Sequence, residues 1–461
     1  MHSHDLAPVP ASVKRNYNNM PSAVVKPISA EELEKLVKAA MRMKTCLIPK
    51  GRGTSYLWGS VPVVGGIIVD MTEMNEIYNL SPEKLWVEAG AGTTWQQVEE
   101  YLGKRGYTLC VYPTSMPSAT VGGWMASAGS GLGSGGYGVG SLMYGPVGKN
   151  IAAIEAVTGT GKKLTLFDNE DIADFIGTDG ITGFIIKAKI KIRKKPEAAK
   201  QVLVTAKNEE SLQELAERLF ALKTAYYAQF EDAGLIKCKL SINLHTPEIE
   251  GGFLLLAVFE GSKNEVSGDA GQFEVAASNL GGKVLSESDA AKEWEERCYP
   301  MRIKRGGPSV IAGEFTVPAN RLSSALNDVS SELPGGSAKC GIHGVVVGKP
   351  DVLVMPQVLS DERKGFGFLA SLSYSKRFND IAPRHGGKPY GVGHLGAFNA
   401  RLVHGVEGLR RLKTLKKKYD PFNVINPGKG IEHRTRFGFS VPPALFNLTM
   451  FGLGLFRRGA V

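Results

Sequence analysis

The chain has 461 residues, 43% of them hydrophobic and 22% charged, which is ordinary globular usage and enough length for two or three domains with sizeable cores. The formal net charge is +10, but the basic residues are scattered or fall in short runs, so an anionic substrate, an acidic partner protein or an anionic membrane surface explains the charge better than nucleic acid does. The five cysteines have no C-x-x-C spacing, which gives no support to an iron–sulfur cluster or zinc ribbon and suits a reducing compartment. Residues 1–20 contain no apolar h-region, so we expect no secretory signal and a cytoplasmic protein.

The N-terminal part of the chain alternates between helical and strand patterns. We expect residues 1–23 to form a loose arm, followed by an amphipathic helix up to residue 40 in which Ser29 is the N-cap and Glu32 completes a capping box. Apolar β-rich runs at 66–70 and 85–90 then predict strands.

A glycine turn follows an apolar strand at residues 48–55, IPKGRGTS. A strand, a tight glycine turn and then hydroxyl and amide donors are typical of a loop that binds a pyrophosphate, although a turn without a ligand is the plainer alternative. The Walker A and Rossmann patterns do not fit these residues.

The most informative segment runs from Pro113 to Gly140, where small residues are interleaved with apolar anchors such as Val121 and Trp124. Backbone with so few side chains can approach a large flat ligand closely and offer it N–H groups. A flexible linker would be a Gly/Ser repeat without anchors, so we interpret the segment as a cofactor bed.

Residues 187–195 alternate basic with Ala and Ile and predict a strand with one wet face. Beyond Pro196 the pattern predicts a helix at 209–222, an apolar strand at 252–260 and a helix at 267–280. We therefore expect a separate α+β substrate domain to begin near residue 197 and to end near residue 400.

Four motifs in sequence order resemble the FAD-binding domain of the vanillyl-alcohol oxidase superfamily, also called the PCMH-type or FAD-linked oxidase family. They are the loop at 48–55, the bed at 113–140, the third glycine cluster at 177–185 and the segment YDPFNVINPGK at 419–429. The resemblance implies an α+β fold with a PCMH-type FAD-binding domain of two α+β subdomains and an α+β cap domain with an antiparallel sheet. The implied organisation is an arm (1–23), the FAD-binding domain (24–197), the substrate or cap domain (198–400), a return to the FAD domain (401–433) and a tail (434–461).

The resemblance also assigns cofactor-binding residues. The expected FAD contacts are Pro49, Gly51, Arg52, Gly53, Thr54, Ser55, Pro113, Thr114, Ser115, Ala119, Thr120, Gly122, Gly123, Ala126, Gly129, Tyr137, Gly138, Gly180, Gly183, Ile185 and Asn426. Covalent attachment in this superfamily uses His or Cys in the glycine loops, and neither loop has one, so we expect noncovalent FAD.

The segment EWEER at 293–297 resembles the W-x-x-R element of the D-2-hydroxy-acid dehydrogenase branch, in which the arginine holds the substrate carboxylate. Arg297 is the candidate here, and Arg302 and Arg305 are neighbours that could replace or assist it. The alternative is a surface arginine paired with Glu293 or Glu296.

The same branch carries two histidine elements that bind a divalent metal and abstract the proton. They correspond best to His343 and His394, but the acidic residues and the second histidine of the first element are missing, so a metal site is not supported and the metal is left unknown. Tyr390 and Tyr374 are alternative acids or bases, and a structural role for the histidines stays open.

The tail from residue 434 is apolar, bracketed by arginines and interrupted by Pro442-Pro443. It is too short to span a bilayer dependably and suits interfacial membrane contact, docking on a partner, or packing on its own domain.

Together these features predict an FAD-dependent oxidation of a small 2-hydroxy acid of the D-lactate or glycolate type. No NAD fingerprint is visible, so we expect electrons to leave to oxygen, a quinone, an electron-transfer flavoprotein or an iron–sulfur protein. Two alternatives remain: oxidation of a polyol, aldonolactone or other neutral alcohol, and an electron-relay subunit of a redox complex.

Overall fold

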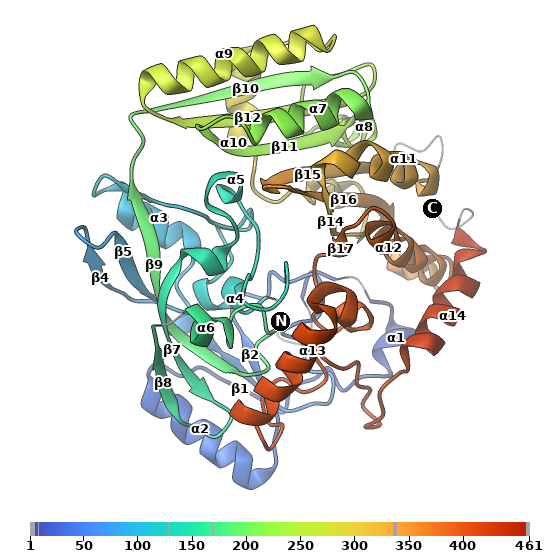
Figure 1. Ribbon diagram of the computed structural model, residues 1–461. Helices are drawn as coiled ribbons and strands as arrows, with labels where there is room; N and C mark the ends of the chain where they lie inside the picture. Colours follow the sequence, from blue (N-terminus) through green and yellow to red (C-terminus); the bar gives the residue numbers. More distant parts are fainter. Residues whose placement is uncertain (1–4, 8, 128, 168, 335–338, 458–461) are drawn as a thin grey trace. The chain divides into compact units, whose positions relative to one another are not determined.

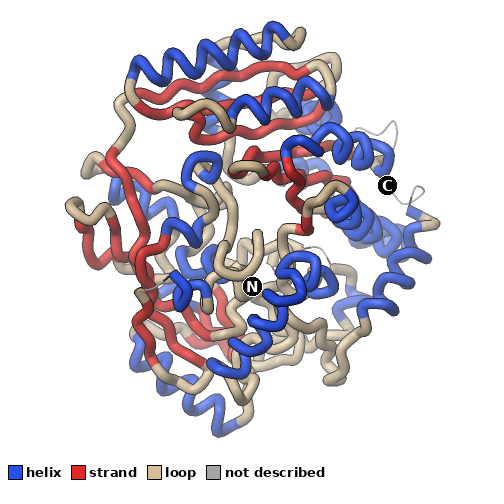
Figure 2. The backbone as a smooth tube through the Cα atoms, viewed as in Figure 1, coloured by secondary structure: helices blue, strands red, loops and turns tan. Residues whose placement is uncertain are grey.

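The computed structural model describes residues 5–7, 9–127, 129–167, 169–334 and 339–457. The chain forms two compact units, and Figures 1 and 2 show the elements of each. Unit 1 comprises Met1–Gly138, Pro146–Lys195 and Tyr390–Phe446, and unit 2 comprises Val139–Gly145, Pro196–Pro389 and Asn447–Val461. The divisions at 195/196 and 389/390 compare with expected ones at 197/198 and 400/401, and the short segment 139–145 joins unit 2 because its helix α5 (Ser141–Tyr144) packs on strands of that unit.

Unit 1 contains two sheets. The smaller one is parallel, with the order β1-β3-β2, and the larger one is antiparallel, with the path β4-β5-β9-β7-β8 and β6 paired to β9. Their strands are β1 Ala23–Val25, β2 Leu47–Lys50, β3 Ile67–Asp70, β4 Ile77–Ser81, β5 Trp86–Gly90, β6 Tyr107–Leu109, β7 Ile151–Thr158, β8 Lys163–Leu166 and β9 Gly183–Lys194. The basic residues at the end of β9 alternate with buried Ala188, Ile190 and Ile192, as the sequence predicts for a strand with one wet face.

Helix α2 (Ala30–Met43) joins the core of unit 1 through Leu33 and Val37, which are completely buried. Ser29 is its N-cap and accepts from the Glu32 backbone N–H, as expected. The Glu32 carboxylate accepts from the N–H of Ile28 instead of the N–H of Ser29, so the expected capping box is not formed. The other helices of unit 1 are α1 Ala11–Lys14, α3 Trp95–Gly103, α4 Val121–Ala126, α6 Asn169–Ala173 and α13 Ala400–Tyr419.

The N-terminal segment packs against unit 1, so the expectation of a loose arm is wrong for its described residues. The Asp5 carboxylate accepts from the backbone N–H groups of Ala7 and Trp58, at 2.9 and 2.7 Å. Val9 and Tyr17 are buried in an apolar cluster with Trp58. The free energy gained by burying these apolar side chains exceeds the conformational entropy lost when a short segment becomes ordered.

Unit 2 is built on one antiparallel sheet with the path β10-β12-β11-β15-β16-β14-β17, and β13 pairs with β16. Its strands are β10 Ala198–Ala206, β11 Ala225–Asp232, β12 Phe253–Gly261, β13 Ser309–Ala312, β14 Phe315–Pro318, β15 Cys340–Gly348, β16 Asp351–Ser360 and β17 Lys388–Pro389. The helices are α7 Glu209–Leu219, α8 Ala233–Ser241, α9 Lys263–Asn279, α10 Glu287–Glu295, α11 Leu322–Glu332 and α12 Phe366–Arg384. The apolar faces of α7, α9, α11 and α12 form one core with the sheet (Figure 1). The expected α+β class with an antiparallel sheet in the second domain is confirmed.

The C-terminal tail ends in helix α14 (Pro443–Gly454), which begins at the second proline of the pair. Phe446 stacks on Phe398 in unit 1, with ring centroids 3.6 Å apart, and Phe456 packs edge-on against Phe366 in unit 2. The tail therefore packs in part on the protein itself, while Leu448 and Phe451 on α14 remain exposed. Among the described residues, no helix has the length and hydropathy needed to cross a bilayer.

Candidate functional site

The first wall of the candidate site is the turn that follows β2. Gly51 comes so close to the second glycine segment that a Cβ on it would lie 2.2 Å from Oγ1 of Thr120. Gly53 has φ = +67°, a conformation that side chains with a Cβ adopt rarely. The turn therefore needs glycine at both positions, for space at Gly51 and for backbone conformation at Gly53.

The second wall is the short helix α4 with its N-cap. The Thr120 hydroxyl accepts from the Gly123 N–H at 3.2 Å, and a Cβ on Gly122 would lie 2.6 Å from Cβ of Ala91. These contacts hold bare backbone along the wall, as expected of a surface that receives a flat ligand.

The third wall joins the glycine cluster at 177–185 to the C-terminal motif. The Asn426 amide donates to the backbone oxygens of Asp179 and Gly59, at 2.7 and 3.0 Å. Oδ1 of Asn426 is buried and finds no hydrogen-bond partner among the described residues, so it can accept from a ligand.

These walls enclose a pocket of about 1020 Å³, counted with its open mouth. Most of the expected cofactor residues line it: Pro49, Gly51, Arg52, Gly53, Thr54, Ser55, Ser115, Ala119, Thr120, Gly122, Gly123, Ala126, Gly180, Gly183, Ile185 and Asn426. The lining also includes residues that the sequence reasoning missed: Lys50, Gly59, Ser60, Met71, Ala91, Trp124, Ser127, Asp179 and Phe184. Several of these are sequence neighbours of the motifs, whereas Met71 and Ala91 reach the pocket only through the fold.

The other expected cofactor residues, Pro113, Thr114, Gly129, Tyr137 and Gly138, are not part of this lining. Pro113 begins the turn that leads into the second wall, and its carbonyl accepts from the Met116 N–H. The Tyr137 N–H donates to the Tyr390 hydroxyl at 2.6 Å, and a Cβ on Gly129 would lie 2.8 Å from the Tyr390 ring. Tyr390 therefore braces the second glycine segment.

The pocket carries a buried cation. Lys50 is 5% exposed, and its side chain lies beside Gly53, where an added Cβ would be 3.2 Å from Nζ. Burial lowers the pKa of Lys50 while Asp5 and Asp70 oppose the shift, so the amine keeps acidic neighbours within the same unit. With exposed Arg52 at the mouth, this side of the pocket suits an anionic group such as a pyrophosphate.

His394 is completely buried and is absent from the pocket lining. Its ring stacks on His433 with centroids 4.2 Å apart, and Nδ1 lies 2.8 Å from the Gly428 carbonyl oxygen. Burial, helped by the Lys429 amine, holds the pKa of His394 well below its usual value, so the ring is neutral. Nε2 has no hydrogen-bond partner among the described residues.

The expected carboxylate-binding arginines lie in unit 2. The Arg297 guanidinium lies 4.0 Å from the Trp294 ring centroid and donates to the Trp294 carbonyl at 2.8 Å. Nη1 of Arg302 forms an ion pair with Glu296 at 2.7 Å, and Arg305 is exposed. Glu296, one of the two carboxylates considered as a partner for Arg297, forms this ion pair with Arg302.

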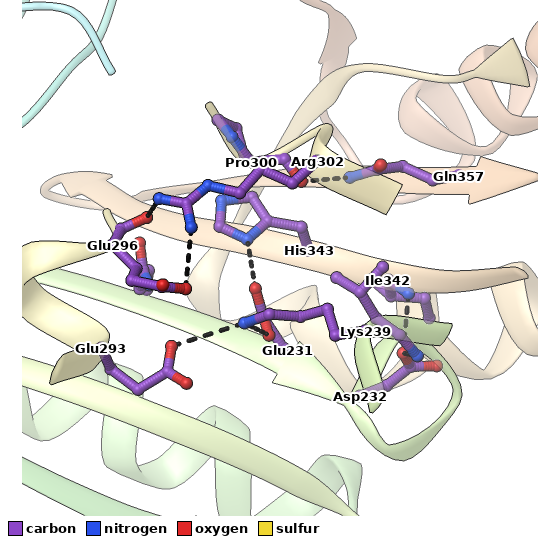
Figure 3. A network of polar contacts seen from close by, with 12 residues as sticks. Glu231, Asp232, Lys239, Glu293, Glu296, Pro300, Arg302, Ile342, His343 and Gln357 are labelled. Carbon is purple, nitrogen blue, oxygen red and sulfur yellow. Dashed lines mark hydrogen bonds and ion pairs between the residues drawn. The ribbon is translucent and has the colours of Figure 1, made fainter. Parts of the chain in front are cut away.

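His343 lies on β15 of the same unit and is 2% exposed. Its cross-strand neighbour on β11 is Glu231, whose carboxylate also binds Lys239 of α8 (Figure 3). The sequence reasoning missed Glu231 and Lys239; the signal available was a Glu-Asp pair at the end of an aromatic strand, AYYAQFED. Within the described parts of the chain, no group of three or more His, Cys, Asp or Glu side chains is arranged to hold a metal ion.

Comparison with known proteins agrees with this architecture. A family model described as the FAD binding domain matches residues 21–166, and one described as the C-terminal domain of FAD linked oxidases matches residues 228–430. The glycolate oxidase subunit GlcD of Bacillus subtilis is 24% identical over 93% of this chain and 91% of that protein. The mitochondrial D-lactate dehydrogenase [cytochrome] of Arabidopsis thaliana is 23% identical over 89% of this chain and 73% of that protein.

The solved structure of p-cresol methylhydroxylase with substrate bound is 17% identical and has a TM-score of 0.73, covering 93% of this chain and 92% of that one. At this identity the likeness concerns the fold. The two family models together match most of the chain, and the motifs expected to bind FAD line one pocket. The chain therefore belongs to the FAD-linked oxidase superfamily, in the group that includes D-lactate dehydrogenases and glycolate oxidase subunits, and is an FAD-dependent oxidoreductase.

Proposed function

We propose that the pocket of unit 1 binds FAD noncovalently, with the pyrophosphate near Lys50 and the turn at 51–55. The observation that carries the proposal is the convergence of three glycine-containing walls on one pocket whose lining offers backbone, one buried amine and the unpaired Oδ1 of Asn426. Among the described residues, the lining has no His, Cys or Tyr side chain to form a bond to the flavin. When bound, FAD supplies the hydride acceptor of the reaction.

Acid precipitation of the purified protein tests the mode of binding. We expect the flavin, absorbing near ~450 nm, to appear in the supernatant. Flavin that stays with the denatured protein would contradict noncovalent binding, and a colourless protein that takes up no added FAD would contradict the pocket assignment.

For the substrate we propose a small 2-hydroxy acid, in accordance with the names of the relatives, and reaction at its CH–OH group. Arg302 and Arg297 are the candidates for holding the carboxylate, and His343 is the candidate for taking the hydroxyl proton. Tyr390 and His394 remain candidates within unit 1, although Tyr390 braces a loop and His394 is enclosed.

Anaerobic mixing of the holoenzyme with glycolate, D-lactate and a polyol, followed at the flavin band, separates the candidate functions. Bleaching by an acid supports the proposed reaction. Bleaching by the polyol alone would favour a neutral alcohol as substrate, and absence of bleaching by all of them would favour an electron-relay subunit.

The carboxylate contact is tested by Arg302→Met and Arg297→Met. A lost charge-assisted hydrogen bond costs about 2–3 kcal/mol, so we expect the KM for the acid to rise on the order of 30-fold or more in the variant that lacks the contact, with FAD content unchanged. Arg218→Met, on the exposed surface of α7, is the matched control. Unchanged KM in both test variants would move the anchor away from this segment.

For the electron acceptor we propose a quinone or a redox protein reached through the C-terminal tail, in a cytoplasmic protein that contacts the membrane peripherally. The tail exposes large apolar side chains, with Leu448 68%, Phe451 64% and Leu455 71% exposed. None of the five cysteines, all of them described, forms a disulfide, which supports a reducing compartment.

The double variant Leu448→Gln/Phe451→Gln tests the role of the tail. We expect FAD content and turnover with a soluble dye to stay as in the wild type, and sedimentation with vesicles containing phosphatidylglycerol to be lost. Wild-type protein that ignores such vesicles would contradict membrane contact, and co-purification of a redox partner that the variant loses would favour docking on a protein.

A further inference from the structure

Unit 2 holds a cluster of four buried titratable side chains from four elements. Glu231 comes from β11, Lys239 from α8, Glu293 from α10 and His343 from β15, and their side chains are only 3–9% exposed (Figure 3). Such groups lose their hydration on burial. They occur in protein interiors when an opposite charge neutralises them or when they serve in binding or catalysis.

Lys239 is the centre of the charge balance. Its ammonium donates to Oε2 of Glu231 at 2.8 Å and lies 3.5 Å from Oε2 of Glu293. Burial by itself would raise the pKa of Glu231, but the groups around its carboxylate, chiefly the Lys239 ammonium, hold the pKa below its usual value. Burial raises the pKa of Glu293, which shares the same ammonium. Glu231 is therefore the permanent carboxylate of the cluster.

The carboxylate of Glu231 has two ends. Lys239 engages Oε2, and Oε1 lies 3.7 Å from Nδ1 of His343. That separation is longer than a hydrogen bond and within ion-pair range, and contacts of this kind often tighten when a substrate enters. An ionised carboxylate opposite Nδ1 favours a proton on that nitrogen, and in the neutral ring this tautomer leaves a lone pair on Nε2.

Several polar atoms in and beside the cluster lack hydrogen-bond partners. Nδ1 and Nε2 of His343, Oε1 of Glu293 and Oε1 of Gln357 are buried and have no hydrogen-bond partner among the described residues. A buried polar atom without a partner costs on the order of 1–3 kcal/mol, so a cluster kept only for stability would pair them. Two of these atoms belong to His343, so this side chain can bind a ligand.

A divalent cation fits this cluster poorly. The single carboxylate beside His343 is already occupied by an ammonium, so a dication there would stand next to a fixed positive charge and would lack two further ligands.

We propose that Lys239 is a built-in cation and positioning residue: by binding Oε2 of Glu231 it keeps the other end of that carboxylate turned to His343, and so holds His343 as the Nδ1–H tautomer with Nε2 ready to take a proton. The inference deepens the proposed function, because it names the groups that prepare the base for a hydroxy acid. In that reaction Nε2 would take the proton of the hydroxyl O–H bond, and FAD, when bound, would supply the acceptor for the hydride of the carbinol C–H bond, so that a carbonyl forms.

The tautomer is measured directly with protein labelled with ¹⁵N and ¹³C in histidine, by two-bond ¹⁵N–¹H correlation. His343 is identified among the eight histidines by the signal that disappears in His343→Gln. We expect the Nδ1–H form in the wild type and in Lys239→Arg, which keeps the cation. Lys239→Met should lose the Nδ1–H form, because Glu231 would then be buried without its cation and would take a proton or draw one from the ring.

Lys237→Met is the matched control, since Lys237 is exposed on the same helix. A wild-type His343 in the Nε2–H form, or a Lys239→Met variant that keeps the Nδ1–H form, would overturn the inference. If Lys239→Met does not fold, the tautomer of His343 in the wild type and in Lys239→Arg tests the inference, and an Nε2–H form in either protein contradicts it.

Kinetics separates this inference from the proposed function. With D-lactate or glycolate, whichever reduces the wild-type flavin, we expect Lys239→Met to slow flavin reduction at least 100-fold at saturating acid, with recovery to within tenfold in Lys239→Arg. Reduction by Lys239→Met at the wild-type rate would refute a positioning role. If neither acid reduces the wild-type flavin, the proposed function fails, and the tautomer measurement still tests the role of Lys239.

Discussion

At the scale of single residues, close backbone approach is the property on which the pocket depends most. Gly51 and Thr120 come from different glycine motifs and meet so closely that a methyl group has no room. The turn and the second wall are thus in direct contact, so a substitution at Gly51 affects both.

We expect Gly51→Ala to weaken FAD binding roughly 100-fold, because overpacking of this size costs on the order of 3 kcal/mol and Thr120 must move away from the wall. Fluorescence titration of the apoprotein with FAD measures the affinity. Gly103→Ala, at the end of α3 and outside the pocket, is the control, since its Cβ would meet nothing closer than 3.6 Å. Equal affinities in the two variants would show that the contact is immaterial.

Glu314, between β13 and β14, is a carboxyl whose charge opposes folding. Its burial raises the pKa to about 7, above the ordinary value. Because the folded protein favours the protonated form of Glu314, folding is most favourable below the ordinary pKa of the carboxyl. This contribution to the free energy of unfolding is lost as the pH rises through about 7.

We therefore expect Glu314→Gln to raise the free energy of unfolding of unit 2 by roughly 2 kcal/mol at pH 8 and to change it little at pH 5. Urea denaturation at the two pH values measures the difference. Glu250→Gln, at an exposed position, should have no such pH dependence. A gain of equal size at both pH values would assign the effect to packing rather than to ionisation.

At the scale of elements, an internal ion pair joins α13 to the C-terminal motif. The Lys416 ammonium binds the Asp420 carboxylate at 2.6 Å and donates to the Ile181 carbonyl, while Asp420 accepts from the backbone N–H groups of Val424 and Ile425. Lys416 and Asp420 are buried, so each charge depends on the other. This pair sets the direction in which the chain leaves the helix toward Asn426 in the pocket wall.

Lys416→Met should destabilise unit 1 by about 3–5 kcal/mol, because it leaves the Asp420 carboxylate buried without its cation. Lys417→Met, exposed on the next position, should be neutral within about 0.5 kcal/mol. Thermal unfolding of the two variants makes the comparison. A loss in Lys416→Met no larger than in its control would mean that water or another cation replaces the amine.

At the scale of the whole molecule, the chain forms two units with separate cores, and the cofactor pocket is lined by residues of unit 1 alone. A ligand that binds only the folded form of one unit stabilises that unit by mass action.

Calorimetry should therefore show that FAD at 100 times its dissociation constant stabilises unit 1 by about 2.7 kcal/mol and moves its transition upward. Leu255→Ala, which opens a cavity in the core of unit 2, should lower the other transition by the equivalent of about 2–5 kcal/mol and leave FAD affinity unchanged. A single transition that responds to both changes would show that the two units unfold together.

Several local features of the fold and of the pocket could be predicted from the sequence. The Ser29 cap, the alternating burial of β9 and most of the pocket-lining glycines were predicted because each depends on residues within a few positions of one another. The order of the family motifs along the chain added Asn426 to the predicted cofactor-binding residues, although it is distant in sequence from the glycine loops. Local periodicity and backbone requirements carry such information directly.

The tertiary structure decided the remainder. The pairing of Glu231 with His343 follows from the register of β11 on β15, and Lys239 reaches the same carboxylate from α8, so no spacing in the sequence announces the cluster. Nor could the sequence show that Val9 and Tyr17 pack around Trp58, or that Arg302 forms an ion pair with Glu296. Partners that are distant in the chain are chosen by packing and by the need to pair buried charge, and those choices exist only once the fold has formed.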